Sequence, residues 1–201
     1  MLKISYKPST SNKKPKNTNL KAFSGALIGT VVPVAMMMKK QNIKNPLKLE
    51  YGLKNMVALS GMSILGGTLA GMINEDKKTK FNKFKEGTFQ FLNATLPAIG
   101  AAGALEICKK KNLNTTPSKL LAISIGIIMG MLTSVKFVNK VFDPKDEHPD
   151  RKLSPKDCLA SMDDAIGALA LAKILVVQNL KLDKALPLIY GYCGYRAGSA
   201  E

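Results

Sequence analysis

Residues 55–74 read NMVALSGMSILGGTLAGMIN and contain no charged side chain. At 1.5 Å per residue, a helix of this length spans about 30 Å, which is the thickness of the hydrocarbon core of a bilayer. Ahead of the run, Asn45 and Pro46 supply a capping residue and a proline suited to the first helical turn. Residues 55–74 are therefore the strongest candidate for a membrane-spanning helix.

Three similar runs without charge lie elsewhere in the chain, at residues 22–38, 87–105 and 120–135. Lysine-rich connectors separate them. The last run is slightly short, but Lys119 and Lys136 can extend it by reaching to the two interfaces. We therefore expect an all-α, polytopic transmembrane helical bundle with four spans.

Two shorter apolar segments leave the number of spans open at four or six. Residues 165–177 are interrupted by Lys173, and residues 185–195 contain Pro187 and are too short to cross a bilayer as a regular helix. They form either a final spanning hairpin or a re-entrant or cytoplasmic helical pair. The expected organisation is a disordered basic arm (1–19), a membrane bundle (20–142), an acidic proline-containing connector (143–153) and a C-terminal helical hairpin (154–201).

The composition indicates a lipid partner rather than nucleic acid. The 201 residues include 30 Lys and Arg against 14 Asp and Glu, giving a net charge of +16, and 46% are hydrophobic, too many for a disordered chain. The lysines are spread through the connectors, only two arginines occur, and no nucleic-acid-binding motif is present. Anionic lipid headgroups are the expected partner. A soluble basic all-α interaction domain is the alternative.

The distribution of positive charge gives an orientation. If all six segments cross, 17 Lys and Arg lie on the side of the N-terminus and 11 on the other side. The positive-inside rule then places the N-terminus in the cytoplasm, and we expect a bacterial-type cytoplasmic membrane. Residues 80–84 and 136–140 each combine Lys with Phe at the end of an apolar run, so they either rest aromatic rings at the interface or are ordinary helix ends.

The chain lacks the residue patterns of common catalytic and metal sites. Cys108, Cys158 and Cys193 are far apart and form no C-x-x-C pair, and the only histidine, His148, lies in a proline-flanked acidic connector. Nucleotide-binding loops, nucleophile elbows and zinc-protease motifs are absent from the sequence. We expect no metal, no cofactor and no enzymatic activity.

Small residues recur at every fourth position in the apolar runs, which is typical of helices that approach closely in lipid. The candidate packing residues are Gly25, Gly29, Ser63, Gly67, Gly71, Gly126, Gly130 and Ser134. This pattern favours a compact bundle, a homo-oligomer or a membrane-protein partner. The alternative is that these helices merely tolerate glycine.

A few polar residues and prolines could line a path for a solute or proton: Asn93, Pro97, Asp163, Asp164 and Lys173. Charges inside a membrane are costly and usually functional, and a proline such as Pro97 or Pro33 frees a backbone carbonyl mid-span. Two alternatives stay open. The aspartates also fit a capping box at a helix start, and Gln90, Asn93 and Thr95 also suit hydrogen bonds between helices.

These observations predict a non-enzymatic integral membrane protein that acts as a scaffold or assembly component through helix packing. A small transporter or channel for an ion or small solute is the second hypothesis, and the soluble basic domain is the third.

Overall fold

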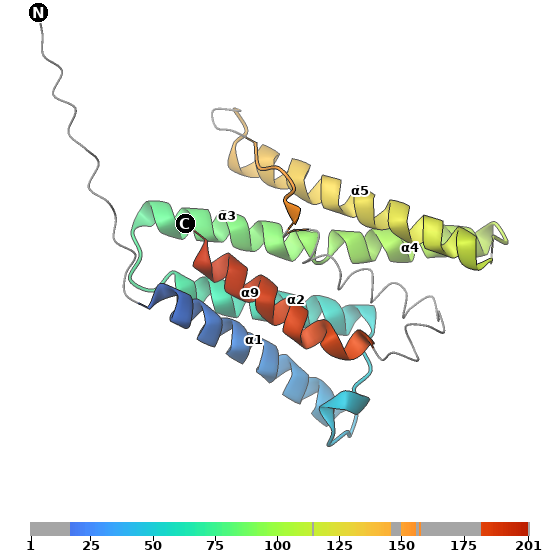
Figure 1. The fold of residues 1–201 in the computed structure, drawn as a ribbon, viewed down its shortest axis with the longest axis horizontal. Coiled ribbons are helices and arrows are strands. Elements are labelled where there is room, and N and C mark those ends of the chain that lie inside the picture. The colour runs from blue at the N-terminus through green and yellow to red at the C-terminus, as the bar shows by residue number, and fades with distance from the viewer. Residues whose placement is uncertain (1–16, 114, 146–149, 156, 158–181, 201) are drawn as a thin grey trace, which may run out of the picture.

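The computed structural model describes residues 17–113, 115–145, 150–155, 157 and 182–200, and this part of the chain is all-helical (Figure 1). It contains α1 (Thr18–Lys40), α2 (Leu53–Gly71), α3 (Lys77–Asn93), α4 (Leu96–Lys110), α5 (Thr116–Phe142) and α9 (Leu186–Ser199). Two short 3₁₀ turns, Pro46–Lys48 and Leu182–Ala185, precede α2 and α9. The expected all-α helical bundle is confirmed.

The helices form two groups on either side of a central rod. α3 and α4 follow each other end to end, with α5 along one side and α1, α2 and α9 along the other (Figure 1). α1 contacts both α2 and α9, α4 contacts α5, and α3 contacts α2, α5 and α9. The C-terminal helix α9 therefore completes the group formed by the first two helices.

The connections between helices lie at two opposite ends of the molecule. The lysine-rich turns after α1 and α4 lie at one end, and the α2–α3 turn and the ends of α5 and α9 lie at the other (Figure 1). The turns after α1 and α4 are alike. Asn42 and Asn112 have φ of 54° and 57°, a left-handed conformation that Asn tolerates. The next residue then bonds back to Met38 O and to Cys108 O, at 2.9 Å in each case.

α2 touches α1 and α9 backbone to backbone at glycines. A Cβ atom on Gly25 would overlap the carbonyl oxygen of Gly66, and one on Gly67 would overlap that of Gly194. Gly29 lies in the same way against the Met62 carbonyl, and Gly71 against that of Gly198. Only a residue without a side chain permits this spacing, so these contacts set the distance between the three helices.

Ser63 occupies the junction of the same three helices. Its hydroxyl is fully buried, donates to Tyr190 O of α9 over 2.8 Å, and lies 2.8 Å from the Thr30 hydroxyl of α1. Among the buried polar residues of α2, Ser63 is thus hydrogen-bonded to both neighbouring helices.

The α4–α5 pair uses the same kind of contact. Gly100 and Gly126 face each other so closely that a Cβ on either would overlap the other's backbone, and Gly130 lies against Pro97. Ser134 is fully buried on the same face of α5, where its hydroxyl donates to Gly130 O over 2.9 Å.

The two prolines expected to break their spans differ. The apolar run 87–105 is divided, because α3 ends at Asn93 and α4 begins at Leu96 with Pro97 in its first turn, where a missing N–H costs little. Pro33 does not break its span: α1 continues through it from Thr18 to Lys40, which corrects the expectation. Neighbouring helices commonly make such a proline tolerable.

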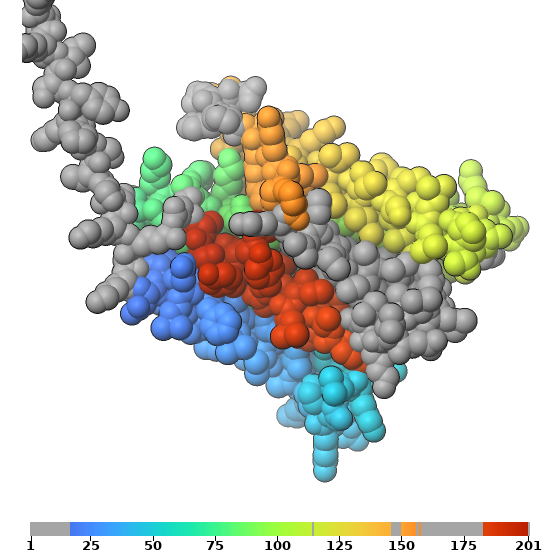
Figure 2. All heavy atoms as spheres, in the orientation of Figure 1, coloured from blue at the N-terminus to red at the C-terminus, as the bar shows by residue number. Residues whose placement is uncertain are grey.

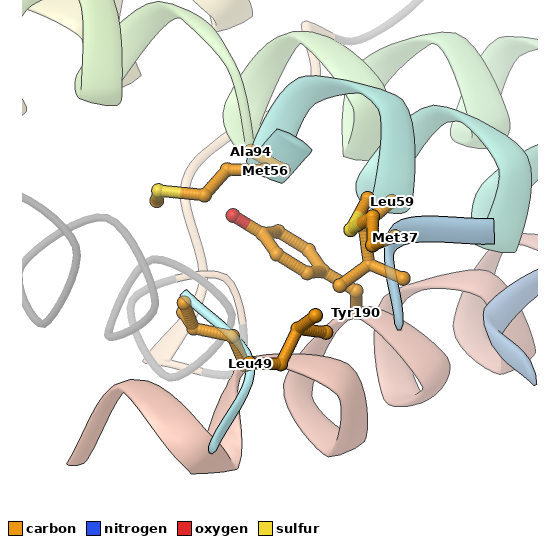
Figure 3. Packing of buried hydrophobic residues seen from close by; sticks show 7 residues of the cluster. Met37, Leu49, Met56, Leu59, Ala94 and Tyr190 are labelled. Carbon is orange, nitrogen blue, oxygen red and sulfur yellow. The ribbon is translucent and has the colours of Figure 1, made fainter. Parts of the chain in front are cut away.

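The largest cluster of buried apolar side chains lies where α1, α2, α3 and α9 approach each other (Figure 3). The Tyr190 ring is fully buried there. It lies among Met37, Leu49 and Leu59, and its hydroxyl is directed toward Met56 and Ala94 (Figure 3). This cluster fixes the start of α9 against the first hairpin.

Most of the large apolar side chains on α1 and α5 face outward. On α1, Leu20, Ile28 and Met36 are 61–63% exposed, and on α5, Leu121 and Met129 are 63–64% exposed. The residues that these helices bury are mainly small or polar, such as Ala22, Ala26, Gly126 and Ser134.

Three helical stretches are long and apolar enough to cross a membrane: Thr18–Lys40, Lys77–Lys110 and Thr116–Phe142. α2, expected to be the strongest span, is not one of them. It begins at Leu53 with the polar Lys54 and Asn55 and ends at Gly71, before the apolar Met72 and Ile73 of the uncharged run. α2 packs against α1, α3 and α9.

Replacing Gly67 by Ala will destabilise the fold, because the new Cβ would overlap the Gly194 carbonyl. Overpacking of this kind costs about 1–3 kcal/mol. Gly103 is the matched control, since it is also in a helix and nothing lies within 4 Å of its Cβ position. Thermal unfolding in detergent should show a lower Tm for Gly67→Ala and an equal or higher one for Gly103→Ala. Equal Tm changes would contradict the close contact between α2 and α9.

Candidate functional site: a buried charge cluster

Four charged side chains from three parts of the chain form one cluster: Glu86 of α3, Arg151 and Asp157 of the segment after α5, and Arg196 of α9. We call these four residues the charge cluster. Their side chains are 19%, 15%, 0% and 17% exposed, respectively, so the whole group is largely withdrawn from water.

Arg151 is the centre of the cluster and makes two forked ion pairs. Its Nε and Nη2 donate to the two oxygens of Glu86 at 3.2 and 3.1 Å. Its Nη1 and Nη2 donate to the two oxygens of Asp157, both at 3.1 Å. The guanidinium also lies over the Phe89 ring, 3.2 Å from the centroid. Only the planar fork of arginine can make these contacts together.

Arg196 completes the charge balance. Its Nη2 donates to Asp157 Oδ1 over 3.0 Å and lies 3.9 Å from Glu86 Oε1. The cluster therefore holds two cations and two carboxylates. Gln90 adds a hydrogen bond to Glu86 Oε1 over 2.7 Å. Burial of ions costs little only when each one is paired in this way.

Local structure positions the segment that carries Arg151 and Asp157. The Asn139 side chain of α5 makes two hydrogen bonds of 3.1 Å with the Arg151 backbone, donating to its carbonyl and accepting from its N–H. Ser154 and Asp157 make the reciprocal hydrogen bonds of a capping box, as their spacing in the sequence predicts. The Asn139 bonds thereby attach Arg151 to α5, and the Ser154–Asp157 bonds form a turn next to the charge cluster.

The cluster keeps both of its central groups ionised. Burial opposes ionisation of Asp157, but hydrogen bonds from Arg151 and Ser154 outweigh it and lower the pKa of this carboxyl to about 2. Burial likewise opposes the charge of Arg151, yet its bonds to Asp157 and Glu86 raise its pKa. Neither group is placed to exchange protons near neutral pH, so the geometry suits a structural connection better than acid–base chemistry.

A second buried cation lies one helical turn from Glu86. Lys83 is 1% exposed, donates to Gly198 O near the end of α9 over 2.6 Å, and lies 3.8 Å from Glu75. Glu75 in turn accepts a 2.9 Å hydrogen bond from Thr18 at the start of α1. Lys83 therefore binds a helix C-terminus inside the fold, a role that the sequence analysis did not predict. Phe81 and Phe84 of the segment 80–84 are exposed.

The structure brings together only some of the residues expected to line a path. Asn93 is 1% exposed, and its amide donates to Asp157 O over 3.4 Å, which joins it to the charge cluster. Pro97 instead packs against Gly130 of α5. Asp163, Asp164 and Lys173 lie outside the described residues. Each of the eight candidate packing residues lies on the buried side or contact face of its helix.

Sequence reasoning missed the charge cluster, although one signal pointed to it. Arg151 and Arg196 are the only arginines in the sequence, which also contains 28 lysines. Arginine is the residue suited to forked, buried ion pairs. The isolated occurrence of two arginines in a lysine-rich chain could therefore have been interpreted as a pair with buried carboxylates.

Within the described residues, no group of three or more His, Cys, Asp and Glu side chains is arranged to hold a metal ion. Comparison of the chain with protein-family models, with curated proteins and with solved structures finds no match.

Exchanging arginine and lysine at positions 151 and 152 will separate the effect of hydrogen-bond geometry on stability from the effect of charge. Arg151→Lys keeps the charge but loses the forked bonds, and should lower stability by about 1.5–3 kcal/mol, the contribution of hydrogen bonds to charged groups. Lys152→Arg is the reverse exchange at an exposed neighbour and should leave stability unchanged. The readout is Tm in detergent, and equal effects at both positions would contradict the role of Arg151.

Acid will weaken the cluster through Asp157. Because its pKa in the fold is about 2, below the unfolded value near 3.9, the carboxylate stabilises the fold above pH 4. This contribution, roughly 2–3 kcal/mol, is lost as pH falls from about 4 to about 2. Asp157→Asn should have a lower Tm at pH 7 and a shallower decrease of Tm below pH 4. Asp150→Asn, at an exposed position, is the control and should follow the parent chain.

Proposed function

We propose that this chain is a non-enzymatic integral membrane protein that acts as a scaffold or assembly component, with its N-terminus in the cytoplasm. The observation that carries the proposal is the arrangement of apolar side chains. Most of the large ones on α1 and α5 face outward, whereas small residues make the closest contacts between helices.

This arrangement is the reverse of the one in soluble proteins, which bury most of their large apolar side chains. A soluble monomer rarely exposes contiguous apolar patches above a few hundred Å², since burying that surface is the main driving force of folding. In lipid, large apolar side chains are favourable on the outside, and helices associate through close backbone contacts. The contacts between Gly25 and Gly66, between Gly67 and Gly194, and between Gly100 and Gly126 have this character.

The soluble alternative requires partners for these outer faces. A basic interaction domain would need another protein to cover Leu20, Ile28 and Met36 of α1 and also Leu121 and Met129 of α5. The two helices lie on opposite sides of the central rod (Figure 1), so one flat partner could not cover both. A lipid environment covers both faces at once.

The scaffold role is supported by how the buried charges are used. Each member of the charge cluster is paired with another member, and Lys83 binds the end of α9. These groups hold α3, the connector and the C-terminal helix together. The glycine contacts are made within one chain, so they support a compact protomer and carry no argument for a homo-oligomer.

A transporter or channel is the second candidate, and one observation favours it. At the break between α3 and α4, Gln90 Oε1 and Thr95 Oγ1 are buried and have no hydrogen-bond partner in the described part of the chain. Discontinuous helices with polar groups at the break are typical of transporter binding sites. Replacing both Asp163 and Asp164 by Asn should abolish ion-coupled flux in proteoliposomes under this hypothesis, and should leave a scaffold's assembly intact.

Single cysteines in a cysteine-free background will test the membrane crossing and its orientation. Lys44→Cys and Lys111→Cys lie in the turns at one end of the bundle, and Lys78→Cys and Lys145→Cys lie at the other. In intact cells, a membrane-impermeant maleimide should label the first pair only, and permeabilisation should add the second. The opposite pattern would reverse the orientation. Labelling of all four positions, or of none, in intact cells would contradict a spanning bundle.

A further inference from the structure

An open cleft of about 640 Å³ lies between the last turns of α5 and the connector. Its floor is apolar, formed by Leu132 and Val135 of α5 and by Leu153 of the connector. Three exposed lysines, Lys136, Lys140 and Lys152, are also part of its lining. The cleft is therefore apolar along one part and cationic along another.

The order of these residues along α5 matches the boundary of a membrane. Leu132 and Val135 belong to the last turn of the uncharged run 120–135, and Lys136 and Lys140 lie in the next two turns. From Leu132 to Lys140 the helix rises about 12 Å. If α5 spans the bilayer, the apolar part of the cleft lies at the depth of the acyl chains and the lysines lie at the depth of the headgroups.

The wall opposite α5 is held in place. The connector is bound to α5 by the two hydrogen bonds between Asn139 and the Arg151 backbone, and the Arg151 side chain is bound to Glu86 and Asp157. Residues of the connector lie between α5 and α9 in Figure 2. The charge cluster thus fixes one side of the cleft, so the cleft does not have to form when a ligand arrives.

The charges that line the cleft favour an anionic ligand. The three lysines have no ion pair among the described residues, and the charge of Arg151 is balanced within the cluster. Two carboxylates, Asp143 and Asp150, also line the cleft. Positive charges therefore outnumber negative ones in the lining, and the Asp150 carboxylate is an acceptor for donor groups such as hydroxyls.

We propose that this cleft binds one anionic phospholipid with a hydroxylated headgroup, of the phosphatidylglycerol class. The lysines bind the phosphodiester, Asp150 accepts a hydrogen bond from a headgroup hydroxyl, and an acyl chain lies against Leu132, Val135 and Leu153. Basic pockets beside transmembrane helices on the cytoplasmic side commonly bind acidic lipids. The inference rests on the proposed function, because an acyl chain is available only to a protein in the membrane.

The test is native mass spectrometry of the detergent-purified protein with mixed phosphatidylglycerol and phosphatidylcholine. The parent chain should retain one phosphatidylglycerol in preference to phosphatidylcholine. A triple variant, Lys136→Gln with Lys140→Gln and Lys152→Gln, should lose this preference by on the order of 100-fold. The corresponding Lys→Arg triple variant should keep it.

A charge-matched control separates a site from general attraction. Lys77, Lys78 and Lys80 are exposed at the same end of the molecule but do not line the cleft. Replacing these three by Gln removes the same charge and should leave the phosphatidylglycerol preference unchanged. An equal loss in both triple variants would overturn the inference and indicate diffuse electrostatic binding.

Two further measurements identify the source of the phosphate and the cause of any failure. Glycerol 3-phosphate should not displace the lipid, and Val135→Thr should weaken lipid retention. If glycerol 3-phosphate competes at equal concentration, the cleft is a soluble-phosphate site and the inference is wrong. If the protein is integral to membranes but shows no preference for phosphatidylglycerol, the inference fails while the proposed function stands. Extraction of the protein without detergent would instead contradict the proposed function itself.

Discussion

The backbone contact of α2 with α1 and α9 is the constraint on which the rest of the structure depends. Gly66 faces Gly25, and Gly67 and Gly71 face the α9 carbonyls of Gly194 and Gly198. Where the backbones are this close, no large side chain fits between them. Most large apolar residues of α1 and α5 lie on the outer surfaces, and polar groups such as Ser63 find partners on adjacent backbones. The outward apolar faces are thus a consequence of the inward small ones.

The charge cluster extends this constraint to the second half of the chain. Close packing of α9 on α2 brings Arg196 to the same place as Glu86 of α3, and Arg151 and Asp157 join them from the segment after α5. Four ions withdrawn from water are stable only as a complete set, since removal of one leaves another unpaired. The cluster therefore couples the position of the connector to that of α9, and through Asn139 it also determines the shape of the cleft beside α5.

Local sequence patterns predicted the individual helices better than they predicted which helices and side chains contact each other. The uncharged runs 22–38 and 120–135 lie within α1 and α5, most of run 55–74 lies within α2, and run 87–105 is divided between α3 and α4. The position of α2 among α1, α3 and α9 was not predicted, because hydropathy cannot tell a helix surrounded by other helices from one that faces lipid. The role of Lys83 was not predicted either, since nothing near it in the sequence reveals that Gly198 O lies beside it. The charge cluster joins residues up to 110 positions apart, so only the rarity of arginine hinted at it.

The central claim is that the apolar faces of α1 and α5 contact lipid, and alkaline carbonate extraction tests it most directly. Membranes from cells that express the tagged chain are washed at high pH, pelleted, and then treated with detergent. The account predicts that the protein stays in the pellet and is released only by detergent. Release into the carbonate supernatant would contradict it, because the outer faces of α1 and α5 would then have to be covered by protein rather than by lipid.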